Sequence, residues 1–203
     1  MYNVGILIWP NAEVLDFCGP FEVFRNTGDL SENEINVFIV AKTNEIVNCM
    51  GLQIKPNYTM EDCPNLDLLI IPGGNSQWAI KQDFILNWVS SQYPKVSHLL
   101  TVCTGALIIA KLGLITDGMI ATTHQEGIPY LIDFSPNASI DPNARFTDNG
   151  KILTSGGISA GIDSSLYMVK KLWGEELANK VAVYMEYDWQ IKTPVMKNPL
   201  SED

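Results

Sequence analysis

Apolar residues follow two alternating patterns along the chain, and each pattern predicts one kind of element. Continuous apolar runs are typical of strands that helices cover on both faces. Such runs predict strands over residues 4–9, 35–41, 66–71 and 99–102. Apolar positions three or four residues apart are typical of amphipathic helices. This spacing predicts helices over residues 16–24, 83–92, 106–111, 162–173 and 177–185.

Glycine and asparagine mark the turns and ends of several elements. Asn149-Gly150 joins the extended segments 144–146 and 151–154, and an Asn-Gly pair in this position is a strong hairpin signal. Residues 45–56 are interpreted as a smaller hairpin around Met50-Gly51. A further strand is predicted over 119–122, Asp83 is expected to cap a helix start, and Gly28, Gly113 and Gly174 are expected to end helices.

The order of these elements predicts the fold class. Strands that alternate with helices indicate right-handed βαβ crossovers, and therefore an α/β fold with a mostly parallel sheet sandwiched by helices. The 203 residues contain no internal repeat and no linker, so we expect one domain over residues 1–190. Residues 191–203 are rich in polar residues and proline, and they are predicted to form a C-terminal tail that is mobile or packed on a neighbouring subunit.

Charge and hydropathy narrow the range of partners. The net charge is −10, and no cluster of lysines or arginines is present, which argues against a nucleic-acid partner. No apolar run approaches the roughly 20 residues that a membrane span needs. The first residues, MYNVGILIWP, lack a basic leader and a cleavage site, so they are interpreted as the first strand of a cytoplasmic domain.

The four cysteines argue against a metal site. Cys18, Cys49, Cys63 and Cys103 form no CxxC pair and no cluster with histidine. A reducing, cytoplasmic setting with free thiols is therefore expected.

The segment Thr101 to Ala106 (TVCTGA) is the most informative about chemistry. An apolar strand leads directly into a helix with Cys103 at the junction. Gly105 stands where the nucleophile elbow G-x-S-x-G has its second glycine, whereas Thr101 replaces the first. Unpaired N–H groups at a helix start stabilise a thiolate, which favours a nucleophilic Cys103. The alternative from the residues alone is a small buried hydrophobe.

Two backbone groups near this cysteine are candidate donors to a developing anion. The N–H of Thr104 is one, because it directly follows Cys103. The N–H of Gly74 is the other, since Pro72-Gly73-Gly74 also follows a predicted strand and ligands bind at the carboxyl ends of parallel strands. Two such groups together would form an oxyanion hole.

Five blocks of the sequence resemble, in order, the ThiJ/PfpI superfamily over residues 2–189. They are WPNAEVLDFCGPFEVF, LLIIPGG, TVCTGALIIAKLGLITDGMIATTH, ARFTDNGKILTSGGISAGIDSSLYMV and VAVYMEYDW. The resemblance implies a class I glutamine-amidotransferase-like fold with flavodoxin-like layering. Within the superfamily, the blocks are most similar to isonitrile hydratases and to the sensor domains of AraC-type regulators. Relatives of this kind imply a homodimer that acts on a small molecule without a cofactor.

The resemblance also assigns roles to individual residues. Cys103 matches the family nucleophile. Asp16 stands at the position where family members hold an acidic group against the sulfur of this cysteine. Thr104 matches the threonine of isonitrile hydratases, and its hydroxyl could orient water. Peptidase-like members have histidine there, so the resemblance argues against proteolysis. Two alternatives remain open: Asp16 as a helix N-cap, and Thr104 as a small residue at a tight turn.

Three further positions concern the surroundings of the site. Cys18 replaces a threonine that the family pattern leads us to expect, which places a second thiol near the site. Gly156-Gly157 adds flexibility to a loop that should neighbour the pocket. His124 follows Cys103 by 21 residues and is either a base or a histidine that braces the pocket, the second being favoured.

The function implied by the resemblance is hydration of an isonitrile through a cysteine thioimidate, giving an N-substituted formamide. Two other functions compete with it. A non-catalytic small-molecule sensor is one, although no room for a helix-turn-helix module is expected after the last helix. A redox or stress protein, in which Cys103 is oxidised reversibly to a sulfenic acid, is the other.

Overall fold

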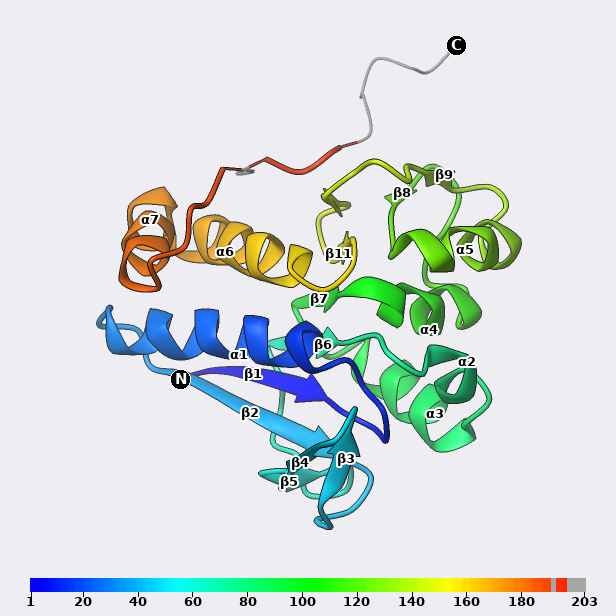
Figure 1. Ribbon diagram of the computed structural model, residues 1–203, viewed down its shortest axis with the longest axis horizontal. Coiled ribbons are helices and arrows are strands. Elements are labelled where there is room, and N and C mark those ends of the chain that lie inside the picture. The colour runs from blue at the N-terminus through cyan, green and yellow to red at the C-terminus, as the bar shows by residue number, and fades with distance from the viewer. Residues whose placement is uncertain (191–192, 197–203) are drawn as a thin grey trace.

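The computed structural model describes residues 1–190 and 193–196 and has a seven-stranded sheet at its centre (Figure 1). The strand order is β10-β11-β7-β6-β1-β2-β5. The strands are β1 Tyr2–Leu7, β2 Ile35–Ala41, β5 Tyr58–Thr59, β6 Leu68–Ile71, β7 His98–Thr101, β10 Phe146–Asp148 and β11 Ile152–Ser155. Neighbouring strands pair in parallel except β10, which is antiparallel to β11. The predicted mostly parallel sheet is confirmed.

Helices cover both faces of the sheet (Figure 1). They are α1 Val14–Asp29, α2 Ser76–Ala79, α3 Asp83–Gln92, α4 Ala106–Lys111, α5 Ile128–Phe134, α6 Ala160–Trp173 and α7 Glu175–Tyr184. The helices α1, α6 and α7 pack against one another on one face, while α3 and α4 lie on the other. The short helical turns η1 Cys103–Gly105 and η2 Gln125–Gly127 precede α4 and α5. Among the described residues, no helix combines the length and the apolar character that a membrane crossing requires.

Several predicted boundaries are confirmed, and the exceptions have physical reasons. β2, α3 and α4 have the predicted limits. The helix predicted over 16–24 extends from Val14 to Asp29, because the polar residues Asn26 and Thr27 are buried and hydrogen-bonded to Glu22 and Val23, which apolar spacing cannot reveal. The helix therefore continues past Gly28 rather than ending there.

The predicted caps have mixed outcomes. Asp83 is the first helical residue of α3 rather than its N-cap, which is Gln82. Gly113 lies after α4 at φ 69°, and the N–H of Leu114 donates to the Ile109 carbonyl at 2.9 Å, so this predicted end is confirmed as a Schellman motif. Gly174 separates α6 from α7 as predicted.

Both predicted hairpins are present. Met50 and Gly51 have φ of 49° and 96° between β3 Val47–Cys49 and β4 Leu52–Ile54. Gly150, at φ 84°, turns the chain between β10 and β11. The strand predicted over 119–122 is β8 Ile120–Ala121, which pairs with β9 Ser139–Ile140.

One part of the predicted tail belongs to the sheet. Val195 pairs in parallel with Thr147 of β10, donating its N–H to the Phe146 carbonyl at 3.0 Å. This segment therefore contacts its own chain at β10, and its predicted packing on a neighbouring subunit stays a prediction. Residues 191, 192 and 197–203 of the predicted tail lie outside the described residues.

Candidate active site

Cys103 lies immediately beyond β7 in a backbone conformation that is unusual for a residue with a side chain. Its φ is 56°, in the left-handed region, which costs energy and persists only where the surroundings hold it. Two hydrogen bonds hold it here. The Cys103 N–H donates to the Gly156 carbonyl at 3.0 Å, and the Cys103 carbonyl accepts from the Thr123 hydroxyl at 2.7 Å. The sharp turn predicted from TVCTGA is therefore present.

Gly105 allows this turn to lie close to the neighbouring strand β6. A Cβ atom at residue 105 would stand 2.3 Å from the Ile71 oxygen and 2.6 Å from the Pro72 oxygen, both of the backbone. Only glycine fits, which gives the physical reason for its place in the elbow pattern.

Replacing Gly105 by alanine is therefore expected to lower the free energy of unfolding by about 3 kcal/mol, because backbone atoms must separate to admit the methyl group. Urea denaturation measures this. Gly156→Ala is the control, since its Cβ would meet its nearest atom at an ordinary 3.5 Å. Equal stability of the two variants would contradict this account of the turn.

Asp16 reaches the cysteine from the first turn of α1. Its side chain is fully buried, and its Oδ2 accepts the Gly73 N–H at 2.8 Å. The Cys103 thiol and the Ile158 N–H are near enough to lower the pKa of this carboxyl group, while its Oδ1 has no hydrogen-bond partner among the described residues. The N-cap position of α1 is held by Glu13, so the N-cap interpretation of Asp16 is wrong. The structure brings the two predicted chemical groups together.

Burial dominates the electrostatics of this pair. It raises the pKa of Asp16 to about 7, although the Gly73 N–H acts in the opposite direction. Burial, and after it the negative charge of Asp16, raises the pKa of Cys103 to about 12, although the Thr104 N–H and hydroxyl lower it. The prediction of a stabilised thiolate is wrong for the resting protein, because α4 begins only at Ala106 and desolvation outweighs the local donors. The resting pair is a thiol beside a carboxyl group that titrates near neutral pH.

A cavity of about 260 Å³ opens beside the cysteine turn. Its lining residues are Gly74, Ser76, Gln77, Thr104, Leu107, Glu126, Gly127 and Tyr130. The two predicted anion donors, Gly74 and Thr104, thus face one space. Within residues 1–190 and 193–196, the Gly74 N–H donates no hydrogen bond, whereas the Thr104 N–H contacts the Cys103 sulfur. Cys103 itself is 6% exposed and is not among the residues that line this cavity, whereas the next residue, Thr104, is.

His124 contacts the loop that supports the site. Its Nδ1 accepts the Glu126 N–H at 3.4 Å, capping η2. Its ring lies so close to Gly157 that a Cβ there would come within 2.2 Å of the ring. The neighbouring Gly156 and Ile158 supply backbone groups to Cys103 and Asp16. This placement corresponds to the bracing interpretation of His124.

Cys18 lies near a second cysteine, Cys49. It is half-buried on α1, and its negative charge would raise the pKa of Cys49 on β3, which shows that these two thiols are neighbours. Cys18 is not among the groups that shift the pKa of Asp16 or of Cys103. The placement of this thiol near the site stays a prediction.

Two features of the site were missed from the sequence. Ser76 bonds the Thr104 hydroxyl with an oxygen–oxygen distance of 2.7 Å, but nothing near Ser76 in the sequence distinguishes it. Ile158 has a φ of 56°, which is rare for a β-branched residue, and its N–H faces Asp16. The preceding glycine pair was the only sequence signal for this loop.

Comparisons with known proteins identify the family of the chain. The model of the DJ-1/PfpI family matches residues 3–171. Isonitrile hydratase of Pseudomonas putida is 33% identical over 189 residues, which cover 91% of this chain and 78% of that protein. The HTH-type transcriptional regulator GbdR of Pseudomonas aeruginosa is 23% identical over 92% of this chain, which spans about half (51%) of that regulator.

Among solved structures, a ThiJ/PfpI family protein from Pseudomonas syringae matches with a TM-score of 0.83 and 28% sequence identity. The match covers 95% of this chain and 77% of that chain. It confirms the class I glutamine-amidotransferase-like fold that the sequence blocks implied. With the family model matching most of the sequence, the chain belongs to the DJ-1/PfpI family.

Proposed function

We propose that this protein hydrates an isonitrile to an N-substituted formamide, with Cys103 as nucleophile and Asp16 as proton carrier. The observation that carries the proposal is the fully buried Asp16 carboxyl group beside the Cys103 thiol, where burial raises the pKa of Asp16 to about 7. The 33% identity to an isonitrile hydratase supports the substrate class. Because Cys103 is buried, the proposal requires a substrate with a slim reactive end, which the linear R–N≡C group has.

The first step forms a carbon–sulfur bond. Asp16, as the carboxylate, takes the proton of the Cys103 thiol, and the sulfur attacks the terminal carbon of R–N≡C. Asp16 then gives the proton to that carbon, which leaves the thioimidate Cys103–S–CH=N–R. A carboxyl group with a pKa of about 7 can accept and return a proton at neutral pH, which this step requires.

The second step consumes water. Its oxygen bonds to the thioimidate carbon, and the nitrogen receives a proton. The resulting Cys103–S–CH(OH)–NH–R breaks its carbon–sulfur bond as the hydroxyl proton returns to sulfur, releasing HC(O)–NH–R. The N–H groups of Gly74 and Thr104 stabilise charge on this oxygen, and the Thr104 hydroxyl, fixed by Ser76, orients the water.

The test is turnover of a small isonitrile. Purified protein is incubated with cyclohexyl isonitrile, and N-cyclohexylformamide is measured by gas chromatography with mass detection. Product in many-fold excess over protein is expected, with heat-denatured protein as the control. Intact-protein mass spectrometry should detect an adduct with the mass of one isonitrile. Absence of formamide above the control would refute the proposal, and tight binding without turnover would favour a sensor.

A further inference from the structure

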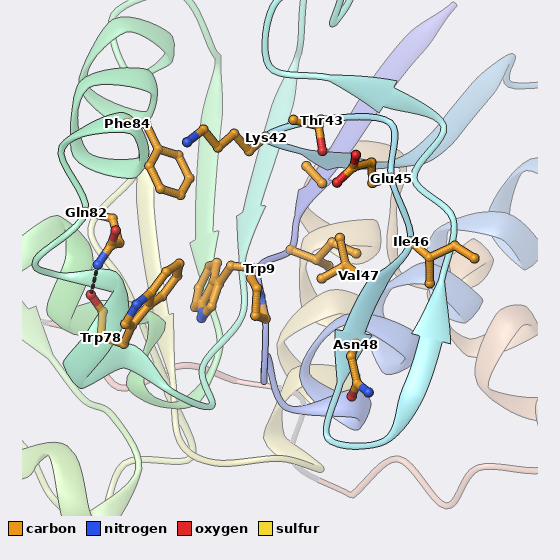
Figure 2. A pocket seen from close by; sticks show the side chains of 13 residues that line it. Trp9, Lys42, Thr43, Glu45, Ile46, Val47, Asn48, Trp78, Gln82 and Phe84 are labelled. Carbon is orange, nitrogen blue, oxygen red and sulfur yellow. Dashed lines mark hydrogen bonds between the residues drawn. The ribbon is translucent and has the colours of Figure 1, made fainter.

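A pocket of about 500 Å³ lies apart from the cysteine, at the carboxyl ends of β1 and β2 (Figure 2). It opens between the β3–β4 hairpin and the segment that contains α2 and the start of α3. Its volume is within the range of small-molecule sites, and this end of a parallel sheet is where ligands bind. None of its lining residues belongs to the cavity beside Thr104. The pocket therefore has space for a second, separate ligand.

Both sides of this pocket carry apolar side chains among polar ones. Trp78 and Phe84 are half-buried and meet edge to face, with ring centroids 6.2 Å apart, and Trp9 forms a buried base beside them. Figure 2 shows these three rings on one side and Val47 of the hairpin on the other. Such walls favour a flat or branched apolar group, because binding removes its surface from water.

Two opposite charges flank the mouth of the pocket. The Lys42 Nζ lies 4.3 Å from the centroid of the Phe84 ring, while Glu45 lies on the hairpin side (Figure 2). Both side chains are exposed. In the part of the chain that the structure describes, neither makes an ion pair with any residue. An ammonium and a carboxylate held apart in this way complement a molecule that carries both charges.

We propose that this pocket binds a zwitterion with an apolar body, of the class of the apolar α-amino acids. The carboxylate of the ligand pairs with Lys42 and its ammonium with Glu45, and its apolar side chain lies between Trp78 and Val47. A simple anion is repelled by the net charge of −10, and a simple cation by Lys42 beside the rings. A zwitterion avoids both repulsions.

Isothermal titration calorimetry on the full chain tests the proposal with L-phenylalanine, L-tryptophan and L-leucine. Saturable binding of at least one amino acid is expected. For phenylalanine, the matched analogues are 3-phenylpropionate, which lacks the ammonium, and 2-phenylethylamine, which lacks the carboxylate. Each analogue is expected to bind about tenfold more weakly, because one charge pair is lost.

Substitutions of the two charged residues test whether the amino acid binds in this pocket. Lys42→Met and Glu45→Gln are each expected to weaken binding about fivefold to tenfold, and because both residues are exposed the fold should be unaffected. Lys81→Met and Glu61→Gln remove exposed charges outside the pocket and should leave binding unchanged. Cys103→Ala should bind as the unmodified protein does, so this proposal and the isonitrile proposal can fail independently.

Three results would overturn the proposal. One is no saturable binding of any of the three amino acids. Another is equal affinity for phenylalanine and for its two singly charged analogues. The third is loss of binding in Cys103→Ala with Lys42→Met unaffected, which would place the amino acid at the cysteine instead.

Discussion

Replacing Cys103 by alanine is expected to lower the rate of isonitrile hydration by at least about 10³-fold, because no other group can form the carbon–sulfur bond that divides the reaction into two steps. The buried Asp16 beside it can move a proton, but it cannot supply this covalent intermediate. The thioimidate adduct should also disappear from the protein mass. Formamide production under substrate excess measures the rate.

Cys63→Ala is the matched control for this loss of a thiol. Cys63 is half-buried, and its sulfur donates to the Pro64 carbonyl at 3.4 Å, outside the cavity beside Thr104. The hydration rate of Cys63→Ala should stay within about twofold of the rate of the unmodified protein, because the substitution touches no group that takes part in the proposed reaction. A Cys103→Ala protein that kept a tenth of the rate would exclude the covalent mechanism.

Asp16→Asn is expected to have two opposite effects. Hydration should fall by about 10²- to 10³-fold, because the amide cannot take the thiol proton or deliver it to carbon. Stability at neutral and alkaline pH should rise, because the substitution removes a carboxylate from a fully buried position. If replacing Asp16 stabilises the fold and abolishes turnover, the residue serves the reaction and not the stability of the fold.

The pH dependence of this gain has a definite sign. Burial raises the pKa of Asp16 in the folded protein from 3.8 to about 7, so between these values the folded state retains a proton that the unfolded state has lost. The stability of the unmodified protein therefore falls as pH rises through this interval. The free energy of unfolding of Asp16→Asn should exceed that of the unmodified protein only slightly at pH 4 and by about 2–4 kcal/mol at pH 7. Above pH 7 this difference should stay constant.

Urea denaturation at a series of pH values measures this difference. Asp83→Asn, at an exposed position on α3, serves as the control and should show no such trend. An Asp16→Asn advantage that shrinks between pH 4 and pH 7 would show that the buried carboxyl group is ionised at acidic pH and would contradict the assigned direction.

The sequence predicted the sheet and the cysteine turn because both leave strong local signals. Uninterrupted apolar runs marked the buried strands, and the small residues around Cys103 marked a tight turn. The resemblance then associated Asp16 with that cysteine, although they lie far apart in the chain. The contact between them depends on α1 and β7 meeting at one end of the sheet, which spacing alone cannot show.

The features of the site that the sequence could not predict depend on burial and on the backbone angles of single residues. The protonation state of Cys103 was predicted in the wrong direction, because the cost of desolvation is a property of the packed site. The left-handed Ile158 and the Ser76–Thr104 hydrogen bond arise from tertiary contacts of residues with no distinctive neighbours. The same holds for the proximity of Cys18 to Cys49, because a position on a helix does not tell which neighbour a side chain will meet.

Val195 bears on how copies of this chain could associate. Because it occupies the Phe146 carbonyl and accepts the Asp148 N–H at 3.4 Å, these backbone groups along β10 are no longer available to another molecule. The opposite margin, β5, is only two residues long. Continuous intermolecular sheets are thereby disfavoured at both borders. The predicted homodimer is consequently expected to assemble through helices or hairpins rather than through the edges of its sheet.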